Sequence, residues 1–278
     1  MKKLFAIALA LIVALSLTAV AEQDVIVIGA TPSPHAEVLN FIAEDMAALG
    51  FPIEVQIFTD YNLPCPAVAS GELDANYFAH IPFINGYNAS VSEDEQVVPV
   101  IGVHYEPFGI YSNKYASIDE LPEGATVCIP NDVSNQTRAL FLLQDAGLIV
   151  LPEDALPTDE LNVTDIVEVK NGLQISDIDA SQLPSTLEDK DIAVINGNFA
   201  LDAGLSPLND AIFYEPAEGD AAAIYANYVV VAPADVEAEW VKALESCLCS
   251  EKVYEFMTDN EAYAGGVIPY FALEIEEE

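Results

Sequence analysis

The chain combines a large hydrophobic fraction with a very acidic charge balance. Its 278 residues include 46 acidic and 8 basic side chains, and the formal net charge is −38. A surface of this kind repels nucleic acid and anionic lipid, so both classes of partner are excluded. Hydrophobic residues make up 52% of the chain, which predicts a packed protein with room for two lobes and more than one core.

The N-terminal stretch has the pattern of an export signal, which we place at 1–21. Two lysines precede an apolar run over 4–20, and Ala19 and Ala21 stand at the spacing of a cleavage site before Glu22. A retained membrane anchor is the alternative, because the apolar run is nearly long enough to span a bilayer. The small residues favour cleavage, so we predict an exported protein.

Strand and helix patterns alternate along the rest of the chain. In the first part of the chain we predict a strand at 24–30, a helix at about 35–50, a strand at 53–58, a short helix after Pro64, a short strand or turn at 73–78 and a strand at 97–103. A strand at 125–130 and a helix within 131–147 follow. We then predict strands at 165–169, 191–196 and 226–232, and helices within 235–258. This alternation is typical of α/β folds with open, mostly parallel sheets.

The pattern restarts after residue 105, in a stretch rich in aromatic residues. We therefore predict an α/β protein of two lobes, in which 22–107 and 229–278 form lobe one and 108–228 forms lobe two. Ligands of such folds bind beyond the carboxyl ends of the strands, and two lobes make a cleft between them. The expected ligand site is that cleft.

Arg138 is the single arginine of the sequence, near the start of an apolar helix that Ser134 or Asn135 could cap. Lysine is the commoner base here and would suffice for a surface ion pair. A guanidinium holds a carboxylate through two parallel hydrogen bonds, which an ammonium cannot do. Arg138 is therefore a candidate for binding an anionic ligand group, and pairing with a surface acid is the alternative.

Aromatic side chains gather in a loop-like segment beside predicted strand ends: Tyr61, Tyr77, Phe78 and Phe83, with His80 among them. Aromatic residues usually belong to the core, but those on loops more often line binding sites. His80 could be a structural histidine, a donor in a pocket or a metal ligand.

Three asparagines, Asn196, Asn198 and Asn227, stand where predicted strands end or begin. Asparagine there often only makes turns, but its amide also offers a donor and an acceptor to a polar ligand. We find no catalytic triad order, paired-carboxylate motif, phosphate loop or zinc-ligand spacing, although the four cysteines permit disulfides. The sequence therefore predicts binding rather than catalysis, with no cofactor and no metal.

Several of these segments together resemble one known family. They are "GATPSPHAEVL", "DYNLPCPAVASGELDANYFAHIPF", "IPNDVSNQTRALFLLQDAGLI", "QLPSTLEDKDIAVINGNFA" and "YANYVVV". In this order they resemble the methionine-binding lipoproteins of the NlpA family, the substrate-binding components of methionine-type ABC importers. The resemblance implies a two-lobed periplasmic-binding-protein fold that closes around one amino acid.

The resemblance also implies roles for individual residues. The expected ligand is L-methionine or a close apolar amino acid, and the expected protein partners are the membrane permease and the ATPase of an ABC importer. The family's polar contacts to the α-amino and carboxylate groups fall on Arg138, Asn196 and Asn227, with the arginine on the carboxylate. Its pocket for the thioether side chain falls on Tyr61, Phe78, His80 and Phe83.

The sequence departs from the family pattern at three places. Phe83 stands where tyrosine is common, and Cys65 replaces a frequent asparagine. Ala21-Glu22 occupies the position of the lipobox cysteine, so we expect a periplasmic or cell-surface protein without a lipid anchor.

Two rival functions remain open at this point. One is a metal-binding transport protein that uses His80, His104 and acidic residues. The other is an exported enzyme that acts on an amino acid or a small peptide.

Overall fold

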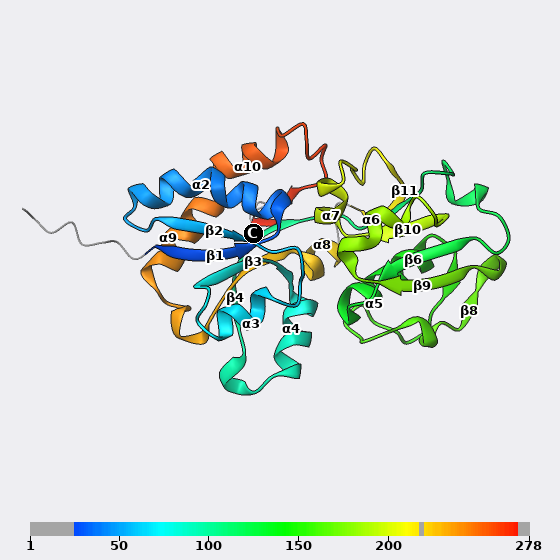
Figure 1. Ribbon diagram of the computed structural model, residues 1–278, viewed down its shortest axis with the longest axis horizontal. Coiled ribbons are helices and arrows are strands. Elements are labelled where there is room, and N and C mark those ends of the chain that lie inside the picture. Colours follow the sequence, from blue (N-terminus) through cyan, green and yellow to red (C-terminus); the bar gives the residue numbers. More distant parts are fainter. Residues whose placement is uncertain (1–24, 217–219, 272–278) are drawn as a thin grey trace, which may run out of the picture.

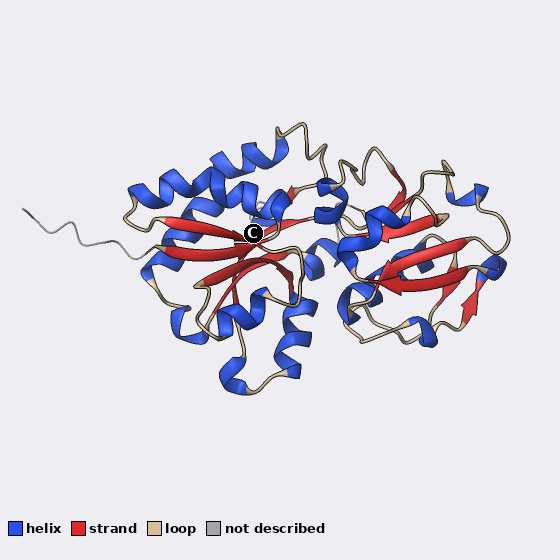
Figure 2. Ribbon diagram, in the orientation of Figure 1, coloured by secondary structure: helices blue, strands red, loops and turns tan. Residues whose placement is uncertain are grey.

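The computed structural model describes residues 25–216 and 220–271, and the predicted signal peptide at 1–21 lies outside these residues. Two α/β lobes lie side by side, each built on its own sheet (Figures 1 and 2). Among the described residues, no helix is both long and apolar enough to cross a membrane.

The first lobe contains a six-stranded sheet in the order β13-β4-β12-β3-β1-β2. Strand β1 is parallel to β2 and β3, whereas β12 is antiparallel to β3 and β4, and β13 is antiparallel to β4. The strands are β1 (Ile26–Ala30), β2 (Ile53–Ile57), β3 (Ala75–His80), β4 (Val98–Tyr105), β12 (Asn227–Val231) and β13 (Ile268–Pro269).

Helices cover both faces of this sheet. The helical elements of the lobe are η1 (Pro32–Ala36), α2 (Glu37–Ala48), α3 (Pro64–Ala69), α4 (Ile81–Ser90), η2 (Glu93–Glu95), η7 (Pro233–Asp235), α9 (Glu239–Leu248) and α10 (Glu251–Thr258). The apolar faces of α2, α9 and α10 share one core with the strands, while α3 and α4 share a second core on the other side. The C-terminal helices thus return to the lobe that the N-terminal strand begins (Figure 1).

The second lobe has a five-stranded sheet in the order β11-β5-β10-β6-β9, and a small sheet of β7 and β8. Strand β6 is parallel to β9 and β10, whereas β5 is antiparallel to β10 and β11. The strands are β5 (Gly109–Tyr111), β6 (Thr126–Pro130), β7 (Ile149–Val150), β8 (Glu168–Val169), β9 (Gln174–Ile178), β10 (Ile192–Ile195) and β11 (Ala211–Tyr214). The helical elements are η3 (Ile118–Glu120), α5 (Val133–Asp145), η4 (Val163–Asp165), η5 (Lys170–Gly172), η6 (Ala180–Gln182), α6 (Leu183–Thr186), α7 (Gly197–Asp202) and α8 (Asp220–Tyr225).

Local sequence explains where the main helices begin and end. The carboxylate of Asp132 accepts the backbone N–H of Asn135 and caps α5, so the expectation that Ser134 or Asn135 caps this helix was wrong. Gly147 follows α5 with a φ of 74°, a left-handed conformation that glycine adopts without a steric penalty. Gly50 ends the α2 segment in the same way, with a φ of 90°.

The chain crosses between the lobes at two places. It leaves the first sheet after β4 and enters the second at β5, so the predicted boundary at 107/108 falls in the crossing segment. It returns from β11 through α8 to β12, and the predicted boundary at 228/229 falls within β12. The expectation of mostly parallel sheets was wrong, because the strands that follow each crossing join their sheets in antiparallel pairs.

Candidate functional site

A narrow cavity lies where the two lobes meet. The first lobe contributes the end of β3 and the start of α4, and the second contributes the first turns of α5 and the start of α7. All seven residues to which the resemblance gives a role in ligand binding line this cavity. Tyr77, which was named with the other aromatic residues, lies in the core instead. The lining residues are Tyr61, Phe78, Ala79, His80, Phe83, Glu106, Asn135, Arg138, Asn196, Gly197, Asn198 and Asn227.

The strand register brings several of these residues together. Asn227, the first residue of β12, pairs with His80 at the end of β3 on one side. On its other side it pairs with His104 near the end of β4. Glu106 follows β4 by one residue, which places it at the same edge of the sheet.

One wall of the cavity is aromatic. The ring centroids of Tyr61 and Phe78 lie 5.4 Å apart, and Phe83 packs edge-on against both rings at 6.0 and 5.5 Å. Phe199 of the second lobe stacks on Tyr61 at 5.0 Å. This wall offers an apolar surface to a ligand side chain.

His80 links the aromatic wall to the polar side. Its Nδ1 accepts the backbone N–H of Phe83 and caps α4, and its Nε2 lies 3.1 Å from Oδ1 of Asn135. Burial lowers the pKa of His80 to about 3, so the ring is neutral at pH 7. Both ring nitrogens are therefore engaged, and Nε2–H is the donor toward Asn135.

Arg138 has a buried acidic partner that the sequence analysis did not identify. Its Nε and Nη2 lie 2.9 and 2.5 Å from the two carboxylate oxygens of Glu215, and Nη2 also donates to the backbone carbonyl of Glu106 at 2.8 Å. The guanidinium lies over the rings of Phe108 and Tyr225, at 4.6 and 4.3 Å. The alternative that Arg138 pairs with an acid on the surface was wrong, because Arg138 and Glu215 are both buried.

The pairing with Glu215 changes what Arg138 can offer to a ligand. Two of the three guanidinium nitrogens, Nε and Nη2, are held by Glu215 and by the backbone carbonyl of Glu106. Burial acts to lower the pKa of Arg138, but the Glu215 carboxylate outweighs it and raises the pKa above the usual range. Arg138 is thus a permanent cation that lines the cavity and is held in place by Glu215.

The asparagines leave two buried polar atoms without a partner in the described part of the chain. Asn196 donates Nδ2–H to Oδ1 of Asn135 at 2.9 Å, but its Oδ1 has no donor. Asn198 accepts the hydroxyl of Tyr61 at 2.5 Å, but its Nδ2 has no acceptor. Buried polar groups nearly always have partners, so an unpaired acceptor and an unpaired donor in one cavity indicate a polar ligand.

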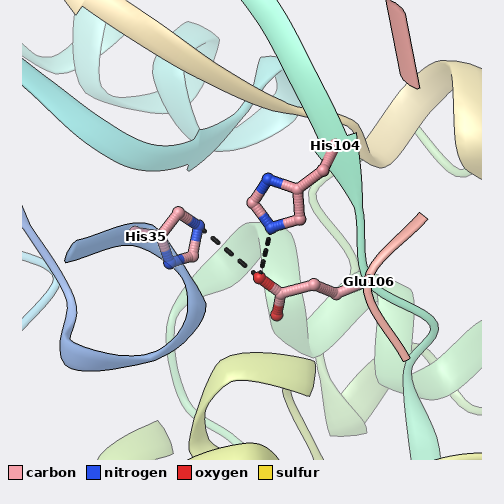
Figure 3. Close-up of side chains that lie close together, drawn as sticks. All are labelled: His35, His104 and Glu106. Atoms are coloured by element: carbon pink, nitrogen blue, oxygen red, sulfur yellow. Dashed lines mark hydrogen bonds and ion pairs between the residues drawn. The ribbon is translucent and has the colours of Figure 1, made fainter. Parts of the chain in front are cut away.

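A buried cluster of His35, His104 and Glu106 adjoins the cavity (Figure 3). Both imidazole Nε2 atoms point to the same oxygen, Oε1 of Glu106, at 3.5 Å from His35 and 2.7 Å from His104. Their potential ligand atoms lie within 4.8 Å of one another, so this is a set of donors that could hold a metal ion. His80 is not among them, and the predicted pairing of His80 with His104 in a metal site was wrong.

Five lining residues of the cavity were not assigned to the ligand site from the sequence: Ala79, Glu106, Asn135, Gly197 and Asn198. The sequence did give a signal for Asn198, because it follows a predicted strand and its amide could contact a polar ligand. Glu106 lies in the segment where the chain crosses between the lobes, but nothing in the sequence sets it apart from the other acidic residues.

Two α/β lobes around one buried, largely neutral cavity define the class of two-lobed substrate-binding proteins. Residues 26–271 match the family of NlpA lipoproteins. The methionine-binding lipoprotein MetQ of Bacillus subtilis is 34% identical over 278 residues, with 97% of this chain and 99% of that protein covered. The D-methionine-binding lipoprotein MetQ of Escherichia coli K12 is 37% identical over 243 residues, with 84% and 82% covered.

A solved structure agrees with these relatives. A nutrient binding protein from Burkholderia cenocepacia, bound to methionine, has a TM-score of 0.82 and 36% identity, covering 88% of this chain and 99% of that chain. The chain belongs to the NlpA lipoprotein family, which confirms the resemblance and the two-lobed fold predicted from the sequence.

Proposed function

We propose that this chain is an exported substrate-binding protein that captures L-methionine, or a close apolar amino acid, and delivers it to an ABC importer. Residues 22–107 and 229–278 would form the first lobe and 108–228 the second, with the ligand enclosed between them. The single observation that carries this proposal is the pair of unpartnered atoms, Asn196 Oδ1 and Asn198 Nδ2, in a buried cavity with an aromatic wall.

The polar side of the cavity suits the head group of an amino acid. An α-ammonium group needs acceptors and an α-carboxylate needs donors. Asn196 and Asn227 are assigned to the polar contacts with these two groups. The carboxylate is assigned to Arg138, which lines the cavity and is permanently charged. This modifies the earlier expectation of a bidentate contact, because Glu215 already holds Nε and Nη2.

The aromatic side suits an apolar, sulfur-containing side chain. Tyr61, Phe78, His80 and Phe83 are assigned to the pocket for this group, since a thioether makes favourable contacts with aromatic rings. The printed names of the Bacillus subtilis and Escherichia coli relatives, and the methionine in the Burkholderia cenocepacia structure, support methionine among the apolar amino acids.

Contacts across the cavity favour binding by lobe closure. Tyr61 of the first lobe donates to Asn198 of the second at 2.5 Å, and His80 of the first lies 3.1 Å from Asn135 of the second. Binding proteins of this architecture close around their ligands by hinge motion. These polar side chains bond to one another rather than forming an activated nucleophile, which supports a binding protein rather than an enzyme.

Mass spectrometry of the purified protein tests this proposal. Native spectra of the gently purified chain should show one bound methionine per protein, and denaturation should release it. Isotopically labelled L-methionine should then exchange into the refolded protein. A bound metal ion in place of methionine would favour a metal-binding transport protein. Chemical conversion of added methionine or methionyl peptides would favour an exported enzyme.

A further inference from the structure

A carboxylate lies in the wall of the cavity, and no lysine or arginine side chain of the described residues bonds to it. Glu106 lines the cavity and its side chain is 6% exposed. Arg138 bonds to the backbone carbonyl of Glu106, while its charge is paired with Glu215. Burial raises the pKa of Glu106, and a cation beside it would stabilise the ionised form. A buried, unpaired carboxylate is costly, so this position is suited to a ligand that brings a positive charge.

Two histidines hold this carboxylate in place (Figure 3). His104 and His35 direct Nε2 toward Oε1 of Glu106, and Nδ1 of each ring faces a hydroxyl group, that of Tyr77 for His104 and that of Thr31 for His35. Burial lowers the pKa of both histidines to about 3, so both rings are neutral at pH 7. His104 donates a hydrogen bond to the carboxylate, and His35, whose Nε2 bonds to Oδ1 of Asn227, lies beside it at 3.5 Å. Neither neutral ring neutralises the carboxylate.

The other carboxylate oxygen lies against a backbone that has no side chain. A Cβ on Gly197 would lie 2.6 Å from Oε2 of Glu106, so only glycine permits this approach without a shift. The backbone N–H of Asn198 also donates to the carboxylate. Asn196, beside Gly197, adds the unpartnered acceptor Oδ1 to the same cavity. An ammonium group has three N–H donors and can use several such acceptors.

We propose that Glu106 binds the α-ammonium group of the ligand, and that His35 and His104 are positioning residues for its carboxylate. This inference rests on the proposed function and adds to it: the site requires a free α-amino group and rejects ligands without one. A divalent metal is the other cation that this cluster could bind. Every imidazole nitrogen of the cluster already has a hydrogen-bond partner, however, so the observed network is complete without an ion.

The test compares two ligands on two proteins by calorimetry. The ligands are L-methionine and its des-amino analogue, 4-(methylsulfanyl)butanoate, and the proteins are the wild type and Glu106→Gln. The wild type should prefer methionine by roughly a hundredfold to a few thousandfold, the range expected for a buried charge pair. Glu106→Gln should lose most of this preference by binding methionine more weakly. His104→Gln, which keeps one donor, should lose part of the preference.

Further outcomes decide between the alternatives. An unchanged preference in a folded Glu106→Gln protein overturns the inference and leaves the proposed function intact, whereas a wild type that binds no amino acid overturns the proposed function itself. A stoichiometric metal whose removal by chelator abolishes methionine binding also overturns the inference. If Glu106→Gln does not fold, a structure of the wild type with methionine decides: a hydrogen bond from the α-nitrogen to Glu106 supports the inference, and its absence contradicts it.

Discussion

Arg138 and Glu215, 77 positions apart, form a buried ion pair in which two guanidinium nitrogens meet the two carboxylate oxygens. Tyr105 and the backbone N–H of Phe108 also donate to Oε2 of Glu215, and these bonds help to fix the carboxylate. The pair therefore holds the arginine in one orientation at the cavity. For this reason we expect stability and ligand binding to depend on the same side chain.

We predict that Arg138→Ala lowers both methionine affinity and the free energy of unfolding. Removing one partner of a buried pair costs on the order of 3–5 kcal/mol, because the other charge stays buried. Arg138→Lys should recover only part of this loss, since an ammonium cannot bond both carboxylate oxygens in parallel. Urea denaturation measures the effect. Lys252→Ala removes an exposed pair with Asp45 and serves as the control, with a change of about 1 kcal/mol or less. Equal losses in Arg138→Ala and the control would contradict the prediction.

Tyr61→Phe should weaken methionine binding while leaving the fold stable. The substitution removes the hydroxyl that bonds to Asn198 across the lobes but keeps the ring that stacks on Phe199. A lost hydrogen bond between neutral groups costs about 0.5–1.5 kcal/mol, which corresponds to roughly a threefold to tenfold loss of affinity. Calorimetry tests the affinity, and circular dichroism tests the fold. Unaltered affinity would show that this bond does not contribute to the ligand-bound, closed form.

The three histidines should make part of the stability sensitive to pH. Burial lowers the pKa of His35, His80 and His104 to about 3, from an ordinary value of 6.5. The unfolded chain takes up these protons below about pH 6.5, while the folded protein does not until about pH 3. Their contribution is therefore full above pH 6.5 and is lost as the pH falls toward 3.

Glu106 and Asp202 have raised pKa values, so their contributions to stability change with pH in the opposite direction to those of the histidines. Replacing one histidine separates its contribution from theirs. His104→Gln should destabilise the protein more at pH 7.5 than at pH 5.5, and the difference should be about 1 kcal/mol. Urea denaturation of both proteins at the two pH values measures it. A constant difference would mean that His104 has an ordinary pKa in the folded state.

The mature protein should begin at Glu22 and carry no lipid. The small residues Ala19 and Ala21 stand at the spacing of a cleavage site, and no cysteine lies beside them. The intact mass of the exported protein measures both features. A diacylglycerol adduct, or a mass that includes residues 1–21, would contradict this prediction.

The sequence predicted the main strands and the long helices because their apolar periods are regular. The strand expected at 125–130 is β6 (Thr126–Pro130), and the helix within 131–147 is α5 (Val133–Asp145). Helix α4 (Ile81–Ser90) was missed, because glycine, asparagine and proline interrupt its pattern. Strand β9 (Gln174–Ile178) was missed since its residues alternate between polar and apolar over only one short stretch.

The candidate site was predictable only in part. Arg138 stood out as a single arginine, and the aromatic residues stood out as a group in one segment. Glu106 and Glu215 could not be distinguished among 46 acidic residues, because their burial depends on strand register and on contacts between distant segments. His35 was missed for the same reason, since its link to Glu106 exists only once β1 and β4 share a sheet.

Calorimetric titration of L-methionine into Asn196→Ala and Asn209→Ala tests the central claim most directly. Asn196 has an unpartnered oxygen in the cavity, whereas Asn209 is an exposed asparagine and provides the matched control. We predict that the wild type and Asn209→Ala bind one methionine per chain with equal affinity. Asn196→Ala should bind roughly tenfold more weakly, at the upper end of the cost of a lost hydrogen bond. Equal affinities for the two variants, or no binding of any amino acid by the wild type, would contradict the assignment of this cavity as an amino-acid site.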